Sequence, residues 1–538
     1  MSRPVPRHFS LGDLFELVAD TVPERLALVA GDDRRTYAEL DDRSTRLANH
    51  LMANGVETGD KVAVYSWNRA EWIESMFGAW KARAVPINVN YRYVAEELRY
   101  LFENADVKAV IFERSFAPLV AEVAPDLPLL EHRIVLEDGS RPDAADADAT
   151  AAIAYEDALA AASPERAGIE RSADDLYMLY TGGTTGMPKG VMWRQADIFF
   201  AAMGGGGFGE PPIQTPEEIV ERVKPEDQRM ISMALAPVMH GAAQWGLCIT
   251  LFGGGTTVLY TGHHFDPHEV WRIVEAERAN SVMVVGDAMA RPLAEALAEP
   301  GADYDTSSVF TVGSGGAVFS KVVQDQLRAQ LGDVLIIDTF GASELGAGGS
   351  SLGADEGMRF AANPSMTVLG EDLRPVAAGS GERGLLARRG HIPLGYYKDE
   401  AKTAATYVTD PDGVRWALPG DFALLEEDGS ITLLGRGSGC INTGGEKVYP
   451  EEVEAALKSH PDVFDALVVG LPDDRFGERV AAVVATREGT TPSPDDIAAH
   501  CRTKVAGYKV PRDVRFAEQI GRTPAGKPDY GWAKTLFA

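Results

Sequence analysis

The sequence predicts an α/β fold, with a large N-terminal domain of layered α/β sheets and a small α+β C-terminal domain. Short apolar runs that suit strands alternate with amphipathic runs of helix length over most of the 538 residues, the order expected of largely parallel sheets covered by helices. After Gly435 the chain instead reads as strand, turn, helix, strand, turn and strand. We therefore assign residues 1–435 to the large domain, 436–439 (RGSG) to a hinge and 440–538 to the small domain, because two glycines give a hinge backbone freedom.

Each element follows from its local pattern. An amphipathic stretch starts at Leu11, a short apolar strand is expected over 61–66, a helix over 70–84 and a strand over 85–90. A further helix is expected over 266–279. The remaining predicted strands are the runs KAVIF, LYMLYT, TVLYT, VMVVG, VFTVGS and VLIID.

Three stretches do not fit this alternation. Residues 143–162 are rich in Ala and Asp and residues 201–219 in Gly and Pro, so both read as surface connections. Residues 230–265 contain no Asp, Glu, Lys or Arg, but Pro237, Gln244 and three consecutive glycines interrupt them. That stretch predicts a buried helix followed by a buried strand, not a membrane span.

Charge and cysteine usage exclude several classes of function. The net charge of −29 repels nucleic acid and anionic membrane surfaces. The same field opposes anionic cosubstrates, so any site for one needs its own positive charge. Cys248, Cys440 and Cys501 are far apart and form no CxxC pattern, which argues against a disulfide framework or a zinc site and favours the cytoplasm. The N-terminus has no apolar core of a signal peptide.

The run TGGTTGMPKG at 181–190 has the composition of a phosphate-binding loop. Backbone N–H groups in a Gly-rich turn can point together at an anion, and threonine hydroxyls and Lys189 add donors and charge. A Walker P-loop needs Ser or Thr after its lysine, whereas Gly190 follows here, so a P-loop kinase or NTPase is disfavoured. Taken alone, the run also suits a simple Gly/Thr surface turn.

Several segments in one order resemble the adenylate-forming superfamily, which includes acyl-CoA synthetases, adenylation domains of peptide synthetases and firefly luciferase. They are RTYAEL, YTGGTTGMPKGVMW, APVMHGA, GSGGAV, DTFGASE, GERGLLARRGHIPLGYY, WALPGD, GRGSGCINTGGEKVYP and RTPAGK. The resemblance implies a small β subdomain within the large domain and a mobile C-terminal domain. It also implies that ATP and a carboxylate give acyl-AMP and pyrophosphate, and that CoA then takes the acyl group and releases AMP.

The resemblance also implies roles for individual residues. Lys189 and the Thr/Gly loop would bind the β- and γ-phosphates, Ser343 the α-phosphate, Phe340 the adenine face and Asp338 its amino group, while Asp421 would accept the ribose hydroxyls. The full set of implied ATP-binding residues is Thr181, Gly182, Gly183, Thr184, Thr185, Gly186, Lys189, Gly315, Gly316, Ala317, Asp338, Thr339, Phe340, Gly341, Ser343, Asp421, Arg436 and Lys527.

Four residues are the implied catalytic group: Lys527, Glu344, Lys189 and His240. Glu344 would hold Mg²⁺ together with phosphate oxygens. Lys527 would contact the carboxylate and the α-phosphate during adenylation and then leave as the small domain rotates. His240 suits either a satisfied core histidine or a lining residue of the carboxylate site. CoA would pass the loop of Gly444, Gly445 and Glu446, because two glycines allow close approach of a thin ligand.

The sequence departs from the family pattern at a few positions, and none of them removes an essential charge. Gly182 stands where Ser is usual, Phe340 where Tyr is usual and Ser343 where Thr is usual. Small residues over 284–293 and 204–207 suggest either a roomy acyl pocket or loop variation without meaning for the substrate.

The sequence around the phosphate loop resembles that of actinobacterial ligases of long-chain fatty or steroid side-chain acids. This resemblance implies that the substrate is a hydrophobic carboxylic acid. The alternatives are an acyl-AMP ligase that delivers to a carrier protein and a non-catalytic nucleotide-binding relative. A homodimer is compatible with such enzymes.

Overall fold

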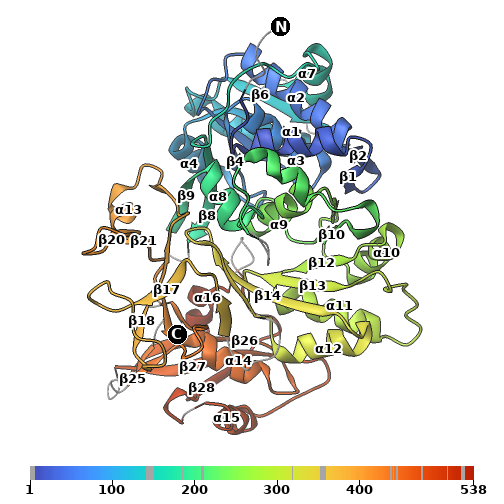
Figure 1. Cartoon of the computed structure of the whole chain (residues 1–538). Helices are drawn as coiled ribbons and strands as arrows, with labels where there is room; N and C mark the ends of the chain where they lie inside the picture. Colours follow the sequence, from blue (N-terminus) through green and yellow to red (C-terminus); the bar gives the residue numbers. More distant parts are fainter. Residues whose placement is uncertain are drawn as a thin grey trace.

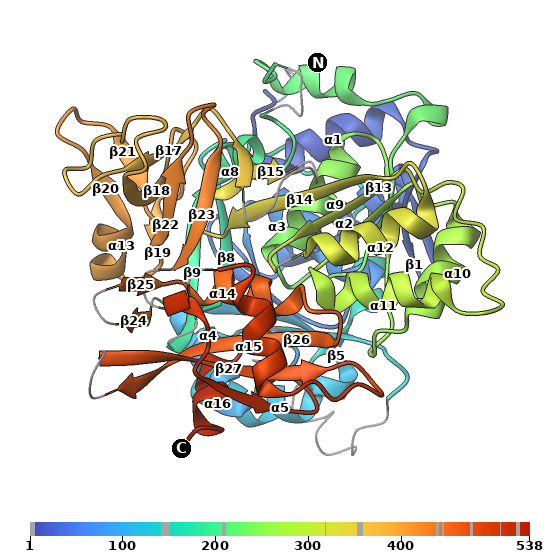
Figure 2. The same ribbon diagram turned by 90° about the horizontal axis from the view of Figure 1, so that it is seen from below.

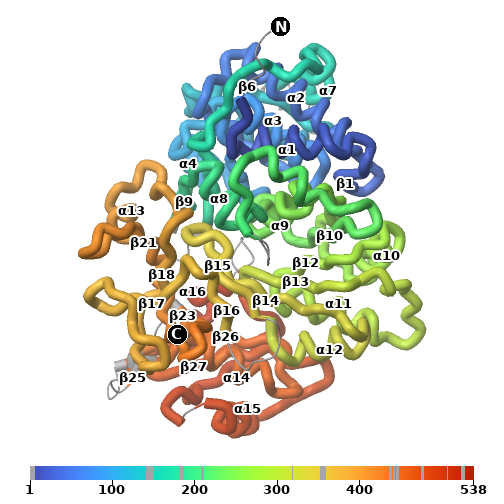
Figure 3. The backbone as a smooth tube through the Cα atoms, in the orientation of Figure 1, coloured from blue at the N-terminus to red at the C-terminus, as the bar shows by residue number. Residues whose placement is uncertain are grey.

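A computed structural model shows how these segments are arranged. The residues it describes are 6–140, 151–183, 186–206, 211–317, 319–351, 359–436, 439, 441–443, 446–473, 477–505, 507–522 and 528–538. The first third of the chain occupies one end of the molecule and the C-terminal residues the other (Figures 1 and 3).

The N-terminal end is built on a parallel sheet with strand order β4-β3-β5-β6-β7. Its strands are β3 (Lys61–Tyr65), β4 (Val85–Asn88), β5 (Val107–Glu113), β6 (His132–Leu136) and β7 (Ile153–Ala154). The helices of this region are α1 (Leu11–Thr21), α2 (Tyr37–Ala53), α3 (Ala70–Lys81), α4 (Ala95–Ala105), α5 (Ala117–Val123) and α7 (Tyr155–Ala161). Helix α2 begins with a capping box, in which the Thr36 side chain accepts from the Glu39 backbone and the Glu39 side chain accepts from the Thr36 backbone.

A second, fifteen-stranded sheet runs through the centre of the large domain. Its parallel part pairs β1 (Leu26–Ala30), β11 (Thr256–Leu259), β10 (Ile231–Ala234), β12 (Ser281–Val284), β13 (Thr311–Gly315) and β14 (Leu335–Ala342), with β2 (Asp33–Thr36) antiparallel at its edge. The crossover helices are α9 (Gly241–Phe252), α10 (Pro267–Glu277), α11 (Asp287–Ala298) and α12 (Lys321–Leu331). The carboxyl ends of parallel strands meet at one edge, where ligands bind in open α/β sheets.

The same sheet continues into an antiparallel β subdomain through the hairpin of β14 and β15 (Gly346–Ser351). The further strands are β16 (Arg359–Ala362), β17 (Met366–Leu369), β18 (Arg383–Arg389), β20 (Tyr407–Thr409), β21 (Arg415–Ala417), β22 (Asp421–Leu425) and β23 (Ile431–Arg436), and helix α13 spans Glu400–Thr406. A three-stranded sheet joins β8 (Leu176–Gly183), β9 (Gly186–Arg194) and β19 (Gly395–Tyr396), and α8 (Gln195–Ala202) follows β9.

The small domain has its own five-stranded sheet and its own core. Its elements are β24 (Ile441–Thr443), β25 (Glu446–Val448), α14 (Pro450–Lys458), β26 (Val463–Asp473), β27 (Gly477–Thr486), α15 (Pro494–Arg502), β28 (Asp513–Phe516) and α16 (Tyr530–Thr535). The small domain (red) lies against the large domain, with α14 in contact with β23 (Figures 1 and 2).

The structure confirms the α/β fold class and corrects three local predictions. The amphipathic stretch from Leu11 ends as helix at Thr21, and β1 follows. The uncharged stretch 230–265 begins with strand β10 before its helix. Part of the supposed connection 143–162 is helix α7. The hydrophobic pattern missed these because a four-residue strand and a seven-residue Ala-rich helix are too short to show a period.

Two further observations concern the predictions about membrane spans and cysteines. Within the described ranges, no helix is both long and apolar enough to cross a membrane. Cys248 of α9 and Cys501 of α15 are buried free thiols.

Candidate functional site

The predicted phosphate loop is the turn of the hairpin between β8 and β9. Thr181 pairs with Lys189 across the two strands, and Gly183 pairs with Gly186. A Cβ on Gly190 would lie 2.8 Å from the ring of Tyr180, so this strand position needs glycine. For Gly182, Gly183 and Gly186 the structure describes only the backbone, and Thr184 and Thr185 lie outside the described residues.

A side chain from the N-terminal sheet fixes the base of this hairpin. The Asn88 amide donates to the Tyr180 carbonyl at 2.8 Å, and its carbonyl oxygen accepts from the Tyr180 N–H at 2.8 Å. The same amide also donates to the Met239 carbonyl at 2.7 Å. Asn88 therefore joins the phosphate loop to the segment that carries His240.

Lys189 carries the charge of the loop and is held by a partner that the sequence analysis missed. Its Nζ donates to Asp399 Oδ2 at 2.5 Å, and the lysine side chain is 44% exposed. This contact holds the pKa of Asp399 below its usual range. The ammonium group of this lysine is therefore accessible from solvent even while it pairs with Asp399.

The proposed metal ligand Glu344 lies just beyond the end of β14. Its Oε1 accepts from the Tyr396 hydroxyl at 2.8 Å. Tyr396 is on β19, opposite Val191 of β9, so this bond links the carboxylate to the strand that carries Lys189. The carbonyl of Ser343 accepts from Trp193 Nε1 at 3.0 Å, which fixes the turn from the other side.

The donor set at Glu344 fits a magnesium ion that arrives with ATP. In the parts of the chain that the structure covers, no group of three or more His, Cys, Asp or Glu could hold a metal. Mg²⁺ in nucleotide sites is commonly held by one or two carboxylates, substrate phosphates and water. One anchored carboxylate near the phosphate loop meets this requirement.

The predicted adenine-side residues lie together on the neighbouring strands β13 and β14. Gly315 is the parallel partner of Thr339, and Ser314 is the partner of Asp338. Gly316 has φ +83°, a left-handed conformation that favours glycine. These pairs place Gly315, Gly316 and Ala317 beside Asp338 and Thr339 at the carboxyl ends of the strands.

The hairpin after Asp338 leaves little room around Phe340. A Cβ on Gly348 would lie 2.8 Å from the Phe340 ring, and one on Gly341 would lie 2.8 Å from the Gly346 carbonyl. The Phe340 ring also packs against Phe360, with centroids 5.8 Å apart. These contacts fix the ring that is predicted to stack on adenine.

Asp338 is in an environment that disfavours its ionised form. Burial, and to a smaller extent the nearby carboxylate of Asp287, raise the pKa of its carboxyl to about 7. Asp287 opens helix α11 and was not among the predicted site residues. Two carboxyl groups therefore lie close together beside the predicted adenine site.

Three other predicted residues lie on elements around this centre. Asp421 of β22 is buried and is the register partner of Arg436 on β23, for which only the backbone is described. His240 is the N-cap residue of α9 and is partly buried, without a side-chain cap bond. Strand pairing thus confirms that positions 421 and 436 adjoin, whereas their contacts with nucleotide stay predictions.

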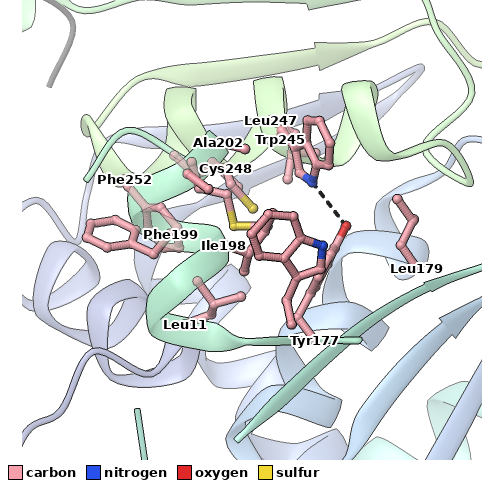
Figure 4. Packing of buried hydrophobic residues seen from close by; sticks show 14 of the residues in the cluster. Leu11, Tyr177, Leu179, Ile198, Phe199, Ala202, Trp245, Leu247, Cys248 and Phe252 are labelled. Carbon is pink, nitrogen blue, oxygen red and sulfur yellow. Dashed lines mark hydrogen bonds between the residues drawn. The ribbon is translucent and has the colours of Figure 1, made fainter. Parts of the chain in front are cut away.

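Helix α9, which follows His240, contributes several side chains to a large apolar cluster, part of which is shown in Figure 4. Trp245 Nε1 donates to the Tyr177 hydroxyl at 3.2 Å, and that hydroxyl donates to Gln244 Oε1 at 2.9 Å. Around this pair lie Leu179, Ile198, Phe199, Ala202, Leu247, Cys248 and Phe252. These side chains are buried and form part of the main hydrophobic core of the large domain.

The remaining predicted residues belong to the small domain and are only partly described. Gly444, Gly445 and Lys527 lie outside the described residues, and Glu446 is described only as backbone of β25. Five residues before Lys527, Arg522 pairs with Asp465, and Asp465 pairs with Lys458 at 3.0 Å.

Helix α11 also contacts the small domain. The prediction that 284–293 is acyl-pocket lining or loop variation stays a prediction, and Arg291 of this segment lies over the ring of Phe464 in the small domain. This contact could not be found from sequence, because the two residues are far apart along the chain and on different domains.

Comparison with protein families gives two matches in chain order. The model of the AMP-binding enzyme family matches residues 15–397. The model of the AMP-binding enzyme C-terminal domain matches residues 452–527. Together they cover most of both domains.

Similar proteins share this arrangement over nearly their whole length. A 3-oxocholest-4-en-26-oate–CoA ligase from Rhodococcus rhodochrous is 48% identical over 98% of this chain and 95% of its own. A medium/long-chain-fatty-acid–CoA/3-oxocholest-4-en-26-oate–CoA ligase from Mycobacterium tuberculosis is also 48% identical, with the same two coverages.

Among solved structures, an anthranilate CoA ligase with bound anthranoyl-AMP superposes with a TM-score of 0.84 at 22% identity, covering 99% of this chain and 98% of its own. ATP-bound MatB from Rhodopseudomonas palustris gives 0.79 at 25% identity, covering 97% and 99%. The first of these likenesses supports the fold alone.

Proposed function

The chain belongs to the AMP-binding enzyme family, and from that premise we propose that it is an ATP-dependent acyl-CoA ligase for a hydrophobic carboxylic acid. The acid is a long-chain fatty acid or a steroid side-chain acid. The observation that carries this proposal is the 48% identity, along 98% of the chain, with ligases named for those acids.

The reaction has two steps, and neither consumes or regenerates a cofactor held permanently by the protein. A carboxylate oxygen attacks the α-phosphorus of ATP, forms acyl-AMP and displaces pyrophosphate. The thiolate of CoA then attacks the acyl carbon, forms the thioester and displaces AMP. Because two anions must meet in the first step, donors and cations aimed at the phosphates lower its barrier.

The described residues can supply that electrostatic help. Lys189 would leave Asp399 and bind the β- and γ-phosphates, together with N–H groups of the hairpin turn. Ser343 would contact the α-phosphate. Glu344, anchored by Tyr396, would hold Mg²⁺, which neutralises phosphate charge when bound. Phe340 and Asp338 would position adenine, with Asp421 and Arg436 on the ribose side.

The acyl group is proposed to enter along α9. His240 would line the carboxylate end, and the apolar cluster around Trp245 and Tyr177 would face the hydrocarbon. Burial of a methylene contributes about 0.8 kcal/mol, so an acyl site lined by such apolar side chains would favour long or polycyclic acids over acetate.

For the small domain, we propose that Lys527 serves adenylation and that the loop of Gly444, Gly445 and Glu446 serves CoA. The nucleophile of the second step is the thiol of CoA, so no cysteine of the chain takes part. A cytoplasmic location and a homodimer complete the proposal.

The test is to measure AMP and thioester with ATP, Mg²⁺ and acids from acetate through palmitate to a cholesterol-derived side-chain acid, each with and without CoA. We expect thioester from the bulky acids only when CoA is present. Acyl-AMP without thioester would indicate a carrier-dependent ligase, and no turnover with any acid would contradict the proposal.

The role of Lys527 is tested by separating the two steps. Lys527→Ala should abolish pyrophosphate exchange yet largely spare thioester formation from supplied acyl-AMP. Lys534→Ala, on helix α16 of the same domain, is the matched control and should change neither step. Equal loss of both steps in Lys527→Ala would contradict the division of roles.

A further inference from the structure

Helix α11 begins between the nucleotide side of the large domain and the small domain. Its N-cap residue Gly286 has φ +57°, and the Gly286 N–H donates to the buried hydroxyl of Ser314 at 3.0 Å. Ser314 is the strand partner of Asp338. The first turn of α11 is therefore tied directly to the predicted adenine-binding strands.

Asp287, the first residue of the helix, makes contacts in two directions. Its Oδ1 accepts from the Ser320 N–H at 2.8 Å, which closes the loop that follows Gly315 and Gly316. Its Oδ2 lies 3.3 Å from a guanidinium nitrogen of Arg291, one turn further along the helix. The Asp287 carboxylate thus connects Ser320, after the predicted adenine-side glycines, with the guanidinium of Arg291.

Arg291 is buried at the contact between the two domains. It is 1% exposed, and its guanidinium lies 5.6 Å above the ring of Phe464 on β26. One turn beyond, Glu295 pairs with Arg487 of the small domain at 3.1 Å. Helix α11 is therefore the part of the large domain that contacts Phe464 of β26 and Arg487 in the small domain.

The contact extends towards the segment that precedes Lys527. Burial alone would lower the pKa of Lys458, but Asp465, Glu454 and, across the domain contact, Asp287 raise it. Asp465 binds both Lys458 and Arg522. A chain of ion pairs therefore runs from Lys458 through Asp465 to Arg522, and Asp465 directly follows Phe464.

The charge of Arg291 is poorly compensated where it lies. Within the described structure its second terminal nitrogen has no hydrogen-bond partner, and burial lowers its pKa despite Asp287. Replacing a buried, weakly paired charge by an apolar side chain often increases stability, so stability alone does not account for an arginine here. Its geometry suits a different role, in which it fixes how the two domains meet.

We propose that Arg291 and Asp287 are positioning residues for adenylation, because they hold the small domain in place relative to the nucleotide site. The proposal rests on the proposed ligase function. Arg291 acts through Phe464, and Asp287 acts through its ion pair with Arg291, so neither needs to touch substrate. Their loss weakens the domain contact seen here, in which Phe464 is followed by Asp465 and Asp465 pairs with Arg522, five residues before Lys527 in the sequence.

The test measures the two half-reactions separately in the full-length enzyme. Arg291→Gln removes the charge at similar size and should lower acid-dependent pyrophosphate exchange about threefold to thirtyfold, the range of typical coupling mutations. Thioester formation from supplied acyl-AMP and CoA should stay within about twofold of wild type, because that step does not need this arrangement. Arg272→Gln, an exposed arginine paired within α10, is the matched control and should alter neither rate.

A variant on the opposite side of the contact protects the test against misfolding. Phe464 is 40% exposed, so Phe464→Leu should fold, and it should lower exchange in the same direction. The double variant should lose less than the product of the two single effects, because both remove one contact. Unchanged exchange in Arg291→Gln, or equal loss of both half-reactions, would overturn the proposal. Absence of acyl-AMP and thioester in the wild type would instead refute the proposed function on which it rests.

Discussion

Replacing Asp338 with asparagine should change how the stability of the protein depends on pH. Burial, helped by Asp287, raises the pKa of Asp338 from its ordinary 3.8 to about 7. The raised pKa means that the neutral form stabilises the fold. That contribution is complete below pH 3.8 and is lost as the pH rises through 7. Asparagine has a similar shape and cannot ionise.

The size of the effect follows from the shift. A change from 3.8 to about 7 is about three pKa units, and at 1.36 kcal/mol per unit this is at most about 4 kcal/mol. Asp338 keeps some contact with solvent, so we reduce this to about 2 kcal/mol. For a large domain that unfolds as one unit, with about 2 cal/mol/K of unfolding entropy per residue, 2 kcal/mol shifts the melting temperature by about 2 °C.

The assay compares wild type and Asp338→Asn by thermal unfolding without nucleotide at pH 5.5 and 8.5. About half of the loss between pH 3.8 and 7 falls between these two pH values, so we expect the variant to gain about 1 °C on wild type. Glu113 and Glu454 also have pKa values raised to about 7 by burial, but both proteins contain them, so their effects cancel in the difference. A difference that is equal at both pH values, or that changes in the opposite direction, would refute the reasoning.

Three further predictions address the phosphate loop, a helix cap and the apolar cluster. Lys189→Ala should lower pyrophosphate exchange at least about a hundredfold, because a cation aimed at the phosphates is lost; an unchanged rate would remove Lys189 from the site. Thr36→Ala should cost about 1 kcal/mol in a denaturant titration by deleting the capping box of α2, and exchange should be normal; the absence of any shift would mean that the cap is not stabilising. Tyr177→Phe should cost about 1–3 kcal/mol, because the Trp245 N–H and the Gln244 carbonyl oxygen lose their buried partner; a neutral result in the same titration would show that they find other partners.

The sequence alone predicted most of the fold where a long period or a clear boundary marked an element. The run at 61–66 became β3, and the helix expected over 70–84 became α3, ending three residues earlier at Lys81. Strand β10 was missed because it is only four residues long and lies in a wholly uncharged stretch. Short apolar runs do not distinguish a strand from a helix.

In the candidate site, too, residues with a recognisable local pattern could be predicted from the sequence, whereas contacts between distant segments could not. Lys189 and Glu344 could be named from their own segments. Their partners could not, because Lys189 and Asp399 are 210 positions apart and Glu344 and Tyr396 are 52 apart. Only the folded sheets bring such residues together, through the pairing of β9 with β19.

The buried thiols of the chain have a consequence for the redox chemistry of its proposed cosubstrate. Burial raises the pKa of Cys501 to about 11 and that of Cys248 still further above its usual range. Exchange with a disulfide requires a thiolate that can reach the sulfur, and neither buried cysteine supplies one at neutral pH. CoA disulfide formed under oxidative stress would therefore not become attached to the protein at Cys248 or Cys501.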